Sequence, residues 1–236
     1  KAIFCEKPLA TSLADADRMI TACADNGVLL SINHSRRWSP IYQEARRLLQ
    51  SNELGPLRAM TVNFFSRRAM LFRNGAHMID VLHFFAEADA AWVWADLEAG
   101  FDHFDIYRGD GGVDPNREPC LDGYLHFTNG VRAHYESAKT AFSNASFTLT
   151  CEQGRLIVTD EQIMVQRLGA DGVIKSMPHL TLTADPQMLK RALAELLRVL
   201  AHGGDLISSG QSARKTLAAM LAMLQSHAQG NVRVNL

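Results

Sequence analysis

At the beginning of the chain, a short apolar strand is joined to a helix by a segment whose backbone is restricted by a proline. Residues 2–5 form an apolar run typical of a strand, and the run ends in Glu6-Lys7-Pro8. Proline fixes its own φ angle and biases the preceding residue toward extended backbone, so Lys7 is held at the strand tip. A capping box over residues 12–15 then predicts a helix, which Asn26-Gly27 ends.

A second strand and helix follow, and the helix is again bounded by residues that start or end helices. Residues 28–32 form another short apolar run, and Ser39-Pro40 starts a helix that Gly55-Pro56 closes. An alternation of strand and helix favours parallel strand pairing. The start of the chain is therefore predicted to be α/β.

From residue 57 the pattern changes to longer strands. Strands are predicted over 57–66 and 90–99, with a helix over about 74–85 between them, and the polar segment 101–119 is typical of a functional loop. A β meander is expected next, at 121–127, 131–137, 146–151, 155–159 and 162–168. Two helices close the chain, from Asp185-Pro186 to Gly203-Gly204 and from about 209 to 228. This second part is predicted to be α+β, with a large, mostly antiparallel open sheet.

The first hairpin of the meander can be given a register. A two-residue turn at Asn129-Gly130 would set the apolar face of one strand beside the polar face of the other. A three-residue loop with Gly130 in the left-handed region instead aligns Phe127 with Val131 and Leu125 with Ala133. The sheet then has an apolar face, and a polar face that is expected to meet solvent, substrate or a partner subunit and that carries Tyr124, His126, His134 and Glu136.

Charge and composition exclude several classes of protein. With 24 basic and 25 acidic residues among 236, the chain offers no positive field for nucleic acid or for an anionic membrane. No apolar run approaches the ~18 residues that a membrane span needs. Four cysteines without finger-type spacing, three of them in apolar stretches, indicate reduced thiols and a cytoplasmic location.

The helix that begins near residue 74 carries a pair of residues suited to acid–base chemistry. His77 and Asp80 are three apart, so they share a helix face and can bond. A carboxylate beside an imidazole fixes its tautomer and keeps it basic, as a general base requires. A packed or capping histidine is the alternative. His83 lies three residues beyond Asp80 and could add a third ligand. Side chains at successive spacings of three rotate around the helix, so His77, Asp80 and His83 cannot all converge on one ion as closely as an i, i+4 histidine pair does, and a metal site is not favoured.

Two further groups fit either a binding site or an ordinary surface. Glu6-Lys7-Pro8 either builds a site or is a strand end with two solvated charges. Arg36-Arg37 follows the strand at 28–32, and arginine at the carboxyl end of a parallel strand can reach a phosphate or carboxylate. A solvated arginine pair at the start of a helix fits that pattern equally well.

Taken in order, these motifs resemble the Gfo/Idh/MocA family of NAD(P)-dependent oxidoreductases. The resemblance implies an N-terminal Rossmann domain and a C-terminal α+β domain whose open sheet mediates oligomerisation. It also implies hydride transfer between NAD or NADP and a CH–OH group of a sugar, cyclitol or related polyol. The segments that carry it are Glu6-Lys7-Pro8, Arg37-Trp38-Ser39-Pro40, Gly55-Pro56, Gly75-x-His77-x-x-Asp80, Gln225-Ser226 and Val232-Arg233-Val234.

The resemblance implies catalytic roles for three residues. Lys7 would hold the reacting oxygen and supply positive charge beside the nicotinamide. His77 would take the proton, and Asp80 would orient His77 and contribute to substrate binding. Cofactor binding would fall to Glu6, Lys7, Pro8 and Arg37.

The substrate side departs from the family pattern. Where many members carry an aspartate four residues before the histidine, this sequence has Arg73, followed by Asn74. Either His77 works without that carboxylate, or the substrate is itself anionic and meets Arg73. Both Arg73 and Asn74 are candidate substrate-binding residues.

The family's glycine-rich dinucleotide loop, which lies upstream of Glu-Lys-Pro, is not found, because the sequence contains no G-x-G-x-x-G. Residues 1–36 are therefore expected to be the C-terminal remnant of a Rossmann domain. Residues 37–236 are expected to form the substrate-binding and oligomerisation domain. Its closing helix is expected to pack back on the first domain. Two interpretations stay open: an oxidoreductase that forms a homodimer or homotetramer through its open sheet, or a truncated, non-catalytic substrate-binding or oligomerisation domain.

Overall fold

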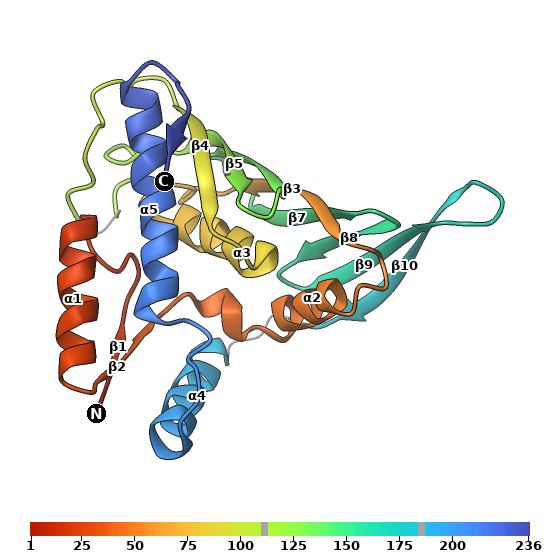
Figure 1. The fold of residues 1–236 in the computed structure, drawn as a ribbon. Coiled ribbons are helices and arrows are strands. Elements are labelled where there is room, and N and C mark those ends of the chain that lie inside the picture. Colours follow the sequence, from red (N-terminus) through yellow and green to blue (C-terminus); the bar gives the residue numbers. More distant parts are fainter. Residues whose placement is uncertain (110–112, 184–186) are drawn as a thin grey trace.

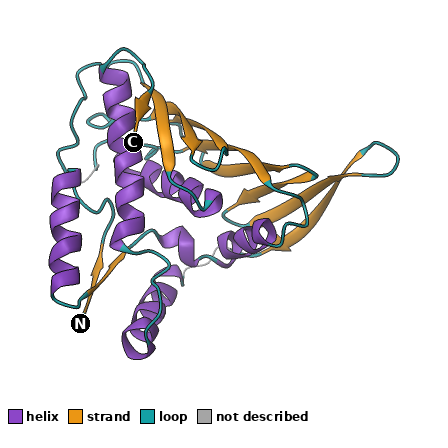
Figure 2. Ribbon diagram, viewed as in Figure 1, coloured by secondary structure: helices purple, strands orange, loops and turns teal. Residues whose placement is uncertain are grey.

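Within residues 1–109, 113–183 and 187–236, which the computed structural model describes, the strands form two sheets (Figure 1 and Figure 2). One is a parallel pair, β1-β2. The other has nine strands in the order β10-β9-β8-β7-β3-β6-β5-β4-β11. The predicted fold class is confirmed: a small parallel α/β unit precedes an α+β body with a large, mostly antiparallel open sheet.

The parallel unit forms as predicted. β1 (Ala2–Cys5) and β2 (Leu29–Ile32) pair in parallel, and α1 (Leu13–Asp25) connects them. Ser12 caps α1 by accepting a hydrogen bond from the Asp15 amide at 3.1 Å, which is one of the two bonds of the predicted capping box. Because the strands are parallel, the segments that follow their carboxyl ends lie at one edge of the pair.

Short helical elements then lead into the body. A 3-10 turn, η1 (Ser35–Trp38), precedes α2 (Pro40–Gln50). Ser39 is the N-cap residue of α2, but its side chain makes no capping hydrogen bond. A π-helical turn, η2 (Leu71–Gly75), runs directly into α3 (Ala76–Ala86), so the helix predicted from about residue 74 has an irregular first turn.

The strand order corrects the predicted meander. The central strand β3 (Leu57–Phe65) lies between β6 and β7, parallel to β6 and antiparallel to β7. Sequence spacing could not indicate this insertion, because it depends on pairing between segments about 70 to 90 residues apart, as the registers Ala59 with Arg132 and Phe65 with Asn144 show. The other strands of this region are β4 (Ala90–Leu97), β5 (Leu121–Phe127), β6 (Arg132–Ala138), β7 (Asn144–Cys151), β8 (Gly154–Thr159) and β9 (Gln162–Leu168).

Two strands were not predicted from the sequence. The edge strand β10 (Ile174–Thr181) has a mostly exposed burial pattern, so it lacks the alternation that marks a half-buried strand. The other, β11 (Val234–Asn235), is only two residues long and pairs with β4 at the opposite edge.

The predicted hairpin register is confirmed. Leu125 lies opposite Ala133, and the Phe127 amide donates to the Val131 carbonyl at 2.9 Å. Gly130 has a φ of +85°, as the three-residue loop requires. One face of β5 and β6 is buried, and the polar residues of the other face are half-buried or exposed.

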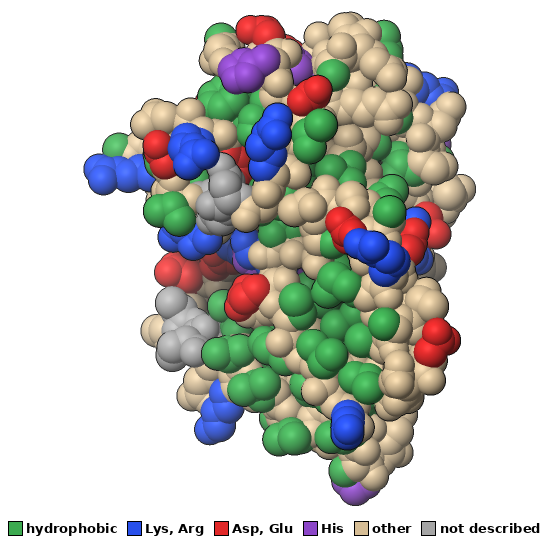
Figure 3. All heavy atoms as spheres, turned by 90° about the vertical axis from the view of Figure 1, so that its left-hand side faces the viewer, with side chains coloured by type: hydrophobic (Ala, Val, Ile, Leu, Met, Phe, Trp, Pro, Cys, Tyr) green, Lys and Arg blue, Asp and Glu red, His purple; other side chains and the backbone are tan. Residues whose placement is uncertain are grey.

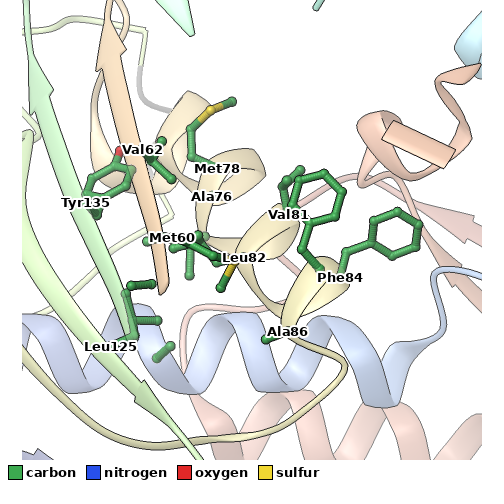
Figure 4. Packing of buried hydrophobic residues seen from close by; sticks show 14 of the residues in the cluster. Met60, Val62, Ala76, Met78, Val81, Leu82, Phe84, Ala86, Leu125 and Tyr135 are labelled. Atoms are coloured by element: carbon green, nitrogen blue, oxygen red, sulfur yellow. The ribbon is translucent and has the colours of Figure 1, made fainter. Parts of the chain in front are cut away.

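The core lies where α3 packs on the apolar face of the sheet. Met60 and Val62 of β3, Leu125 of β5 and Tyr135 of β6 face residues of α3 (Figure 4). Every residue of α3 is buried except His77. A helix enclosed on almost all sides therefore leaves one imidazole partly accessible.

The two closing helices differ in how they pack. α5 (Gly210–Ala228) packs against α1, α3 and β4. α4 (Met188–His202) is peripheral: it buries Leu196 but leaves Leu193 and Leu197 exposed. Hydrophobic side chains also gather on the lower half of the face that carries α1 and the N-terminus (Figure 3).

Some sequence predictions fall where the structure gives no description. The predicted helix start at Asp185-Pro186 and residues 110–112 of the predicted loop lie outside the described residues. Among the residues that are described, no helix combines the length and apolar character needed to cross a bilayer.

Candidate active site

A lysine from the parallel unit meets the turn that precedes α3. The Lys7 ammonium donates a hydrogen bond to the backbone carbonyl of Arg73, 66 residues away. The Lys7–Pro8 peptide bond is cis. This contact joins the tip of β1 to η2, so Lys7 lies beside the start of the helix that carries His77.

The π-helical turn depends on a glycine. The Gly75 amide donates to the Met70 carbonyl at 3.0 Å, which is the i to i−5 bond of a π turn. A Cβ at position 75 would lie 3.0 Å from the Tyr135 hydroxyl and 3.1 Å from the Met70 oxygen. A side chain at this position would therefore require these neighbours to shift by a few tenths of an ångström. The turn sets the direction of the Arg73 carbonyl and leaves Arg73 and Asn74 half-buried beside His77.

The local electrostatics lower the pKa of both Lys7 and His77. Burial, together with the positive charge of Arg73, lowers the pKa of Lys7 to about 8, although Glu6 and Glu118 oppose the shift. Desolvation and the charge of Lys7, among other nearby cations, hold the pKa of His77 well below its ordinary value. At neutral pH His77 is therefore neutral and can accept a proton.

The carboxyl edge of the parallel pair carries a histidine that the sequence reasoning missed. His34 follows β2 and is 2% exposed, and its ring meets the His77 ring edge-on with 6.1 Å between centroids. At the same edge, Asn33 donates to the Glu6 carboxylate at 2.7 Å. The position of His34 directly after a parallel strand is the sequence signal that could have identified this residue.

The expected pairing of His77 with Asp80 is wrong. Asp80 is fully buried and accepts hydrogen bonds from Arg37 Nε and Nη2, both at 2.8 Å, and from the Thr216 hydroxyl at 3.0 Å. A carboxylate with no access to water needs a cation nearby, and Arg37 supplies it. Asp80 is therefore not placed to touch a substrate.

The expected role of Arg37 in cofactor binding is corrected for the same reason. Its third nitrogen, Nη1, donates to the Ile207 carbonyl at 2.7 Å, so each nitrogen of the guanidinium has a partner inside the protein. Arg36 also has a structural partner, because it forms a two-bond ion pair with Asp160 at 2.9 and 3.1 Å. Neither arginine is the solvated residue of the alternative interpretation.

Models of known protein families match both parts of the chain. Residues 1–34 match the family model described as an oxidoreductase family with an NAD-binding Rossmann fold, and residues 42–157 match the GFO/IDH/MocA C-terminal domain. The chain belongs to the Gfo/Idh/MocA family of oxidoreductases. The cofactor class of this family is NAD(P).

Individual relatives cover the chain to different extents. A D-apiose dehydrogenase of Paraburkholderia graminis is 34% identical over 97 residues, which is 35% of this chain and 26% of that protein. A 1,5-anhydro-D-fructose reductase of Ensifer adhaerens is 26% identical over 98% of this chain and 71% of its own length. The aldose–aldose oxidoreductase of Caulobacter crescentus superimposes with a TM-score of 0.78 at 20% identity, over 100% of this chain and 72% of that one, and so shares the fold.

Proposed function

We propose that this protein transfers a hydride between a nicotinamide cofactor and a CH–OH group of a sugar, cyclitol or related polyol. Residues 1–36 would belong to the cofactor domain, and residues 37–236 would bind the substrate. The observation that carries the proposal is the bond from Lys7 to the Arg73 carbonyl. It brings a strand-tip ammonium beside the partly accessible residue of α3, His77.

The edge of the parallel pair fits a nicotinamide cofactor. Ligands of open α/β sheets bind outside the carboxyl ends of the strands, which is where Glu6, Lys7 and Pro8 lie. The cofactor, when bound, supplies the hydride acceptor or donor. Glu6, tied to Asn33, would give this edge a fixed shape, and Lys7 would add positive charge next to the nicotinamide.

Lys7 and His77 would have different roles in the removal of the hydroxyl proton. An alcohol carbon loses hydride only if its hydroxyl proton also leaves and the developing alkoxide is stabilised. Lys7 would donate a hydrogen bond to that oxygen, and His77, neutral at neutral pH, would take the proton. In the reverse direction the same histidine would return it.

Substrate selection would depend on η2. Arg73 and Asn74 are half-buried in the turn that faces Lys7. An arginine here favours a substrate that carries a carboxylate, because a guanidinium can bind both carboxylate oxygens. Turnover of uronates and aldonates should therefore exceed turnover of neutral polyols, and equal turnover of both classes would contradict this assignment.

Cofactor titration separates catalysis from the alternative of a non-catalytic binding domain. In a longer protein that carries the family's glycine-rich dinucleotide loop upstream of residue 1, we expect NAD(H) or NADP(H) to bind in a titration followed by fluorescence. In that protein Lys7→Ala should abolish turnover without altering the melting curve. Lys190→Ala is the matched control, because Lys190 is an exposed lysine of α4. Binding of NAD(H) or NADP(H) near micromolar concentration by residues 1–236 alone would rule out the non-catalytic interpretation. If Lys7→Ala remained active in the longer protein, the role proposed for Lys7 would be wrong.

We also propose self-association through the outer face of the large sheet. Trp92 stacks on Tyr124 at 4.9 Å and on His126 at 5.4 Å, and the Arg233 guanidinium lies 4.5 Å from the Trp92 ring centroid. Beside them Trp94 is 37% exposed. Such an exposed aromatic patch favours a protein partner. Light scattering should show a dimer or larger assembly that Trp94→Glu dissociates, and a monomeric wild-type protein would contradict the proposal.

A further inference from the structure

We propose that His34 is a positioning residue that fixes the orientation of the His77 ring. The inference rests on the proposed function, in which His77 accepts the substrate proton. It assigns a task to a buried histidine that none of the roles above uses.

The backbone holds His34 in place. Its amide donates to the Ile32 carbonyl at 2.7 Å, and its carbonyl accepts from the Arg37 amide at 3.0 Å. The residue therefore has defined contacts on both sides, between β2 and η1. With 2% of its surface exposed, the side chain also has little freedom to move.

The ring of His34 connects His77 to a fixed ion pair. Its Nδ1 lies 3.6 Å from the Asp80 carboxylate, which Arg37 and Thr216 hold by three hydrogen bonds. On its other side, the His34 ring is nearly perpendicular to the His77 ring, at 88°. His34 therefore links the Asp80 carboxylate to the His77 ring.

Within the described part of the chain, one ring nitrogen of His77 makes no contact that would fix the orientation of the ring. The buried Nδ1 of His77 has no hydrogen-bond partner among the described residues, and neither does Nδ1 of His34. Because no hydrogen bond between Nδ1 and a described residue sets its angle, the orientation of the ring depends on what it packs against. An edge-to-face contact between aromatic rings is a favourable and directional arrangement.

Ring packing predicts a specific order of activities among variants. His34→Ala should lower kcat about 10- to 100-fold with little change in KM, as losses of a group that orients a functional histidine do. His34→Phe keeps a flat ring edge against His77 and should recover most of that loss. His83→Ala is the matched control, since it removes another buried histidine of α3 and should leave kcat near the wild-type value.

A readout that needs no turnover separates this inference from the proposed function. Ring-proton NMR of His77 should show one narrow set of signals in the wild-type protein and in His34→Phe, and broadened or doubled signals in His34→Ala. If alanine prevents folding, His34→Leu replaces it, because leucine fills the space without a flat edge. Unchanged His77 signals in the alanine or leucine variant, or a phenylalanine variant no better than alanine, would overturn the inference. Absence of turnover in the wild-type protein would refute only the proposed function.

Discussion

The buried ion pair between Arg37 and Asp80 gives the sharpest test of how the site is supported. Asparagine at position 80 has nearly the shape of aspartate, so Asp80→Asn removes the charge while filling the same space. The Arg37 guanidinium, only 6% exposed, would then remain buried without a counter-ion. The fold should lose stability for an electrostatic reason and not through a cavity.

The expected loss follows from the contacts. Removing one partner of a buried pair costs about 3–5 kcal/mol, because the remaining charge stays desolvated. Thr216→Val deletes only the third hydrogen bond to Asp80, and a bond to a charged group contributes about 1.5–3 kcal/mol. The double variant Arg37→Met with Asp80→Leu leaves no unpaired charge, and should be more stable than Asp80→Asn alone.

Urea unfolding at pH 7 and 25 °C measures all of these differences on one scale. The four proteins should rank as wild type, Thr216→Val, the double variant and Asp80→Asn, with the middle two close together. The reasoning would be refuted by a loss under about 1 kcal/mol in Asp80→Asn, which is the range of exposed pairs. It would also be refuted if the double variant lost as much as Asp80→Asn.

The Arg37–Asp80 ion pair also predicts that the folded protein loses stability at acidic pH. Burial alone would raise the pKa of Asp80, but the charge of Arg37, with smaller contributions from His34 and Thr216, lowers it below its ordinary value. A carboxylate with a lowered pKa stabilises the fold fully above its unfolded pKa of about 3.9, and this contribution disappears as pH falls through the folded value. Asp80→Asn should therefore lose less stability than wild type between pH 7 and pH 3.

Three further outcomes test other parts of the structure. Because the pKa of Lys7 is lowered to about 8 in the folded protein, the unfolded chain holds that proton to higher pH, and wild-type stability should rise between pH 8 and about 10.4. Urea unfolding should show no such rise in Lys7→Met. Gly75→Ala should cost about 1–3 kcal/mol through overpacking and reduce kcat, and Tyr135→Phe in the same chain should restore part of both. In thermal unfolding, Leu196→Ala should cost about 2–5 kcal/mol but Leu197→Ala under about 0.5 kcal/mol, since only Leu196 is buried. Equal losses at the two positions would contradict the packing of α4.

Local features of the fold were predictable because neighbouring residues decide them. The capping of α1 needs only Ser12 and the residue three positions on. The hairpin between β5 and β6 follows from a glycine and from the alternation of apolar residues on two adjacent strands. By contrast, the place of β3 between β6 and β7 depends on pairing across long stretches of chain, and loop closure over such distances leaves no local signal.

The sequence by itself determined that Lys7 closely follows a strand and that His77 lies at the start of a helix, because proline geometry and helical periodicity are properties of short segments. Only the tertiary structure decided which groups these residues meet. It placed Lys7 against the Arg73 carbonyl, and it paired Asp80 with Arg37. The physical reason is that a buried charge takes whichever partner shares its burial, and the fold of the whole chain determines which groups are buried together.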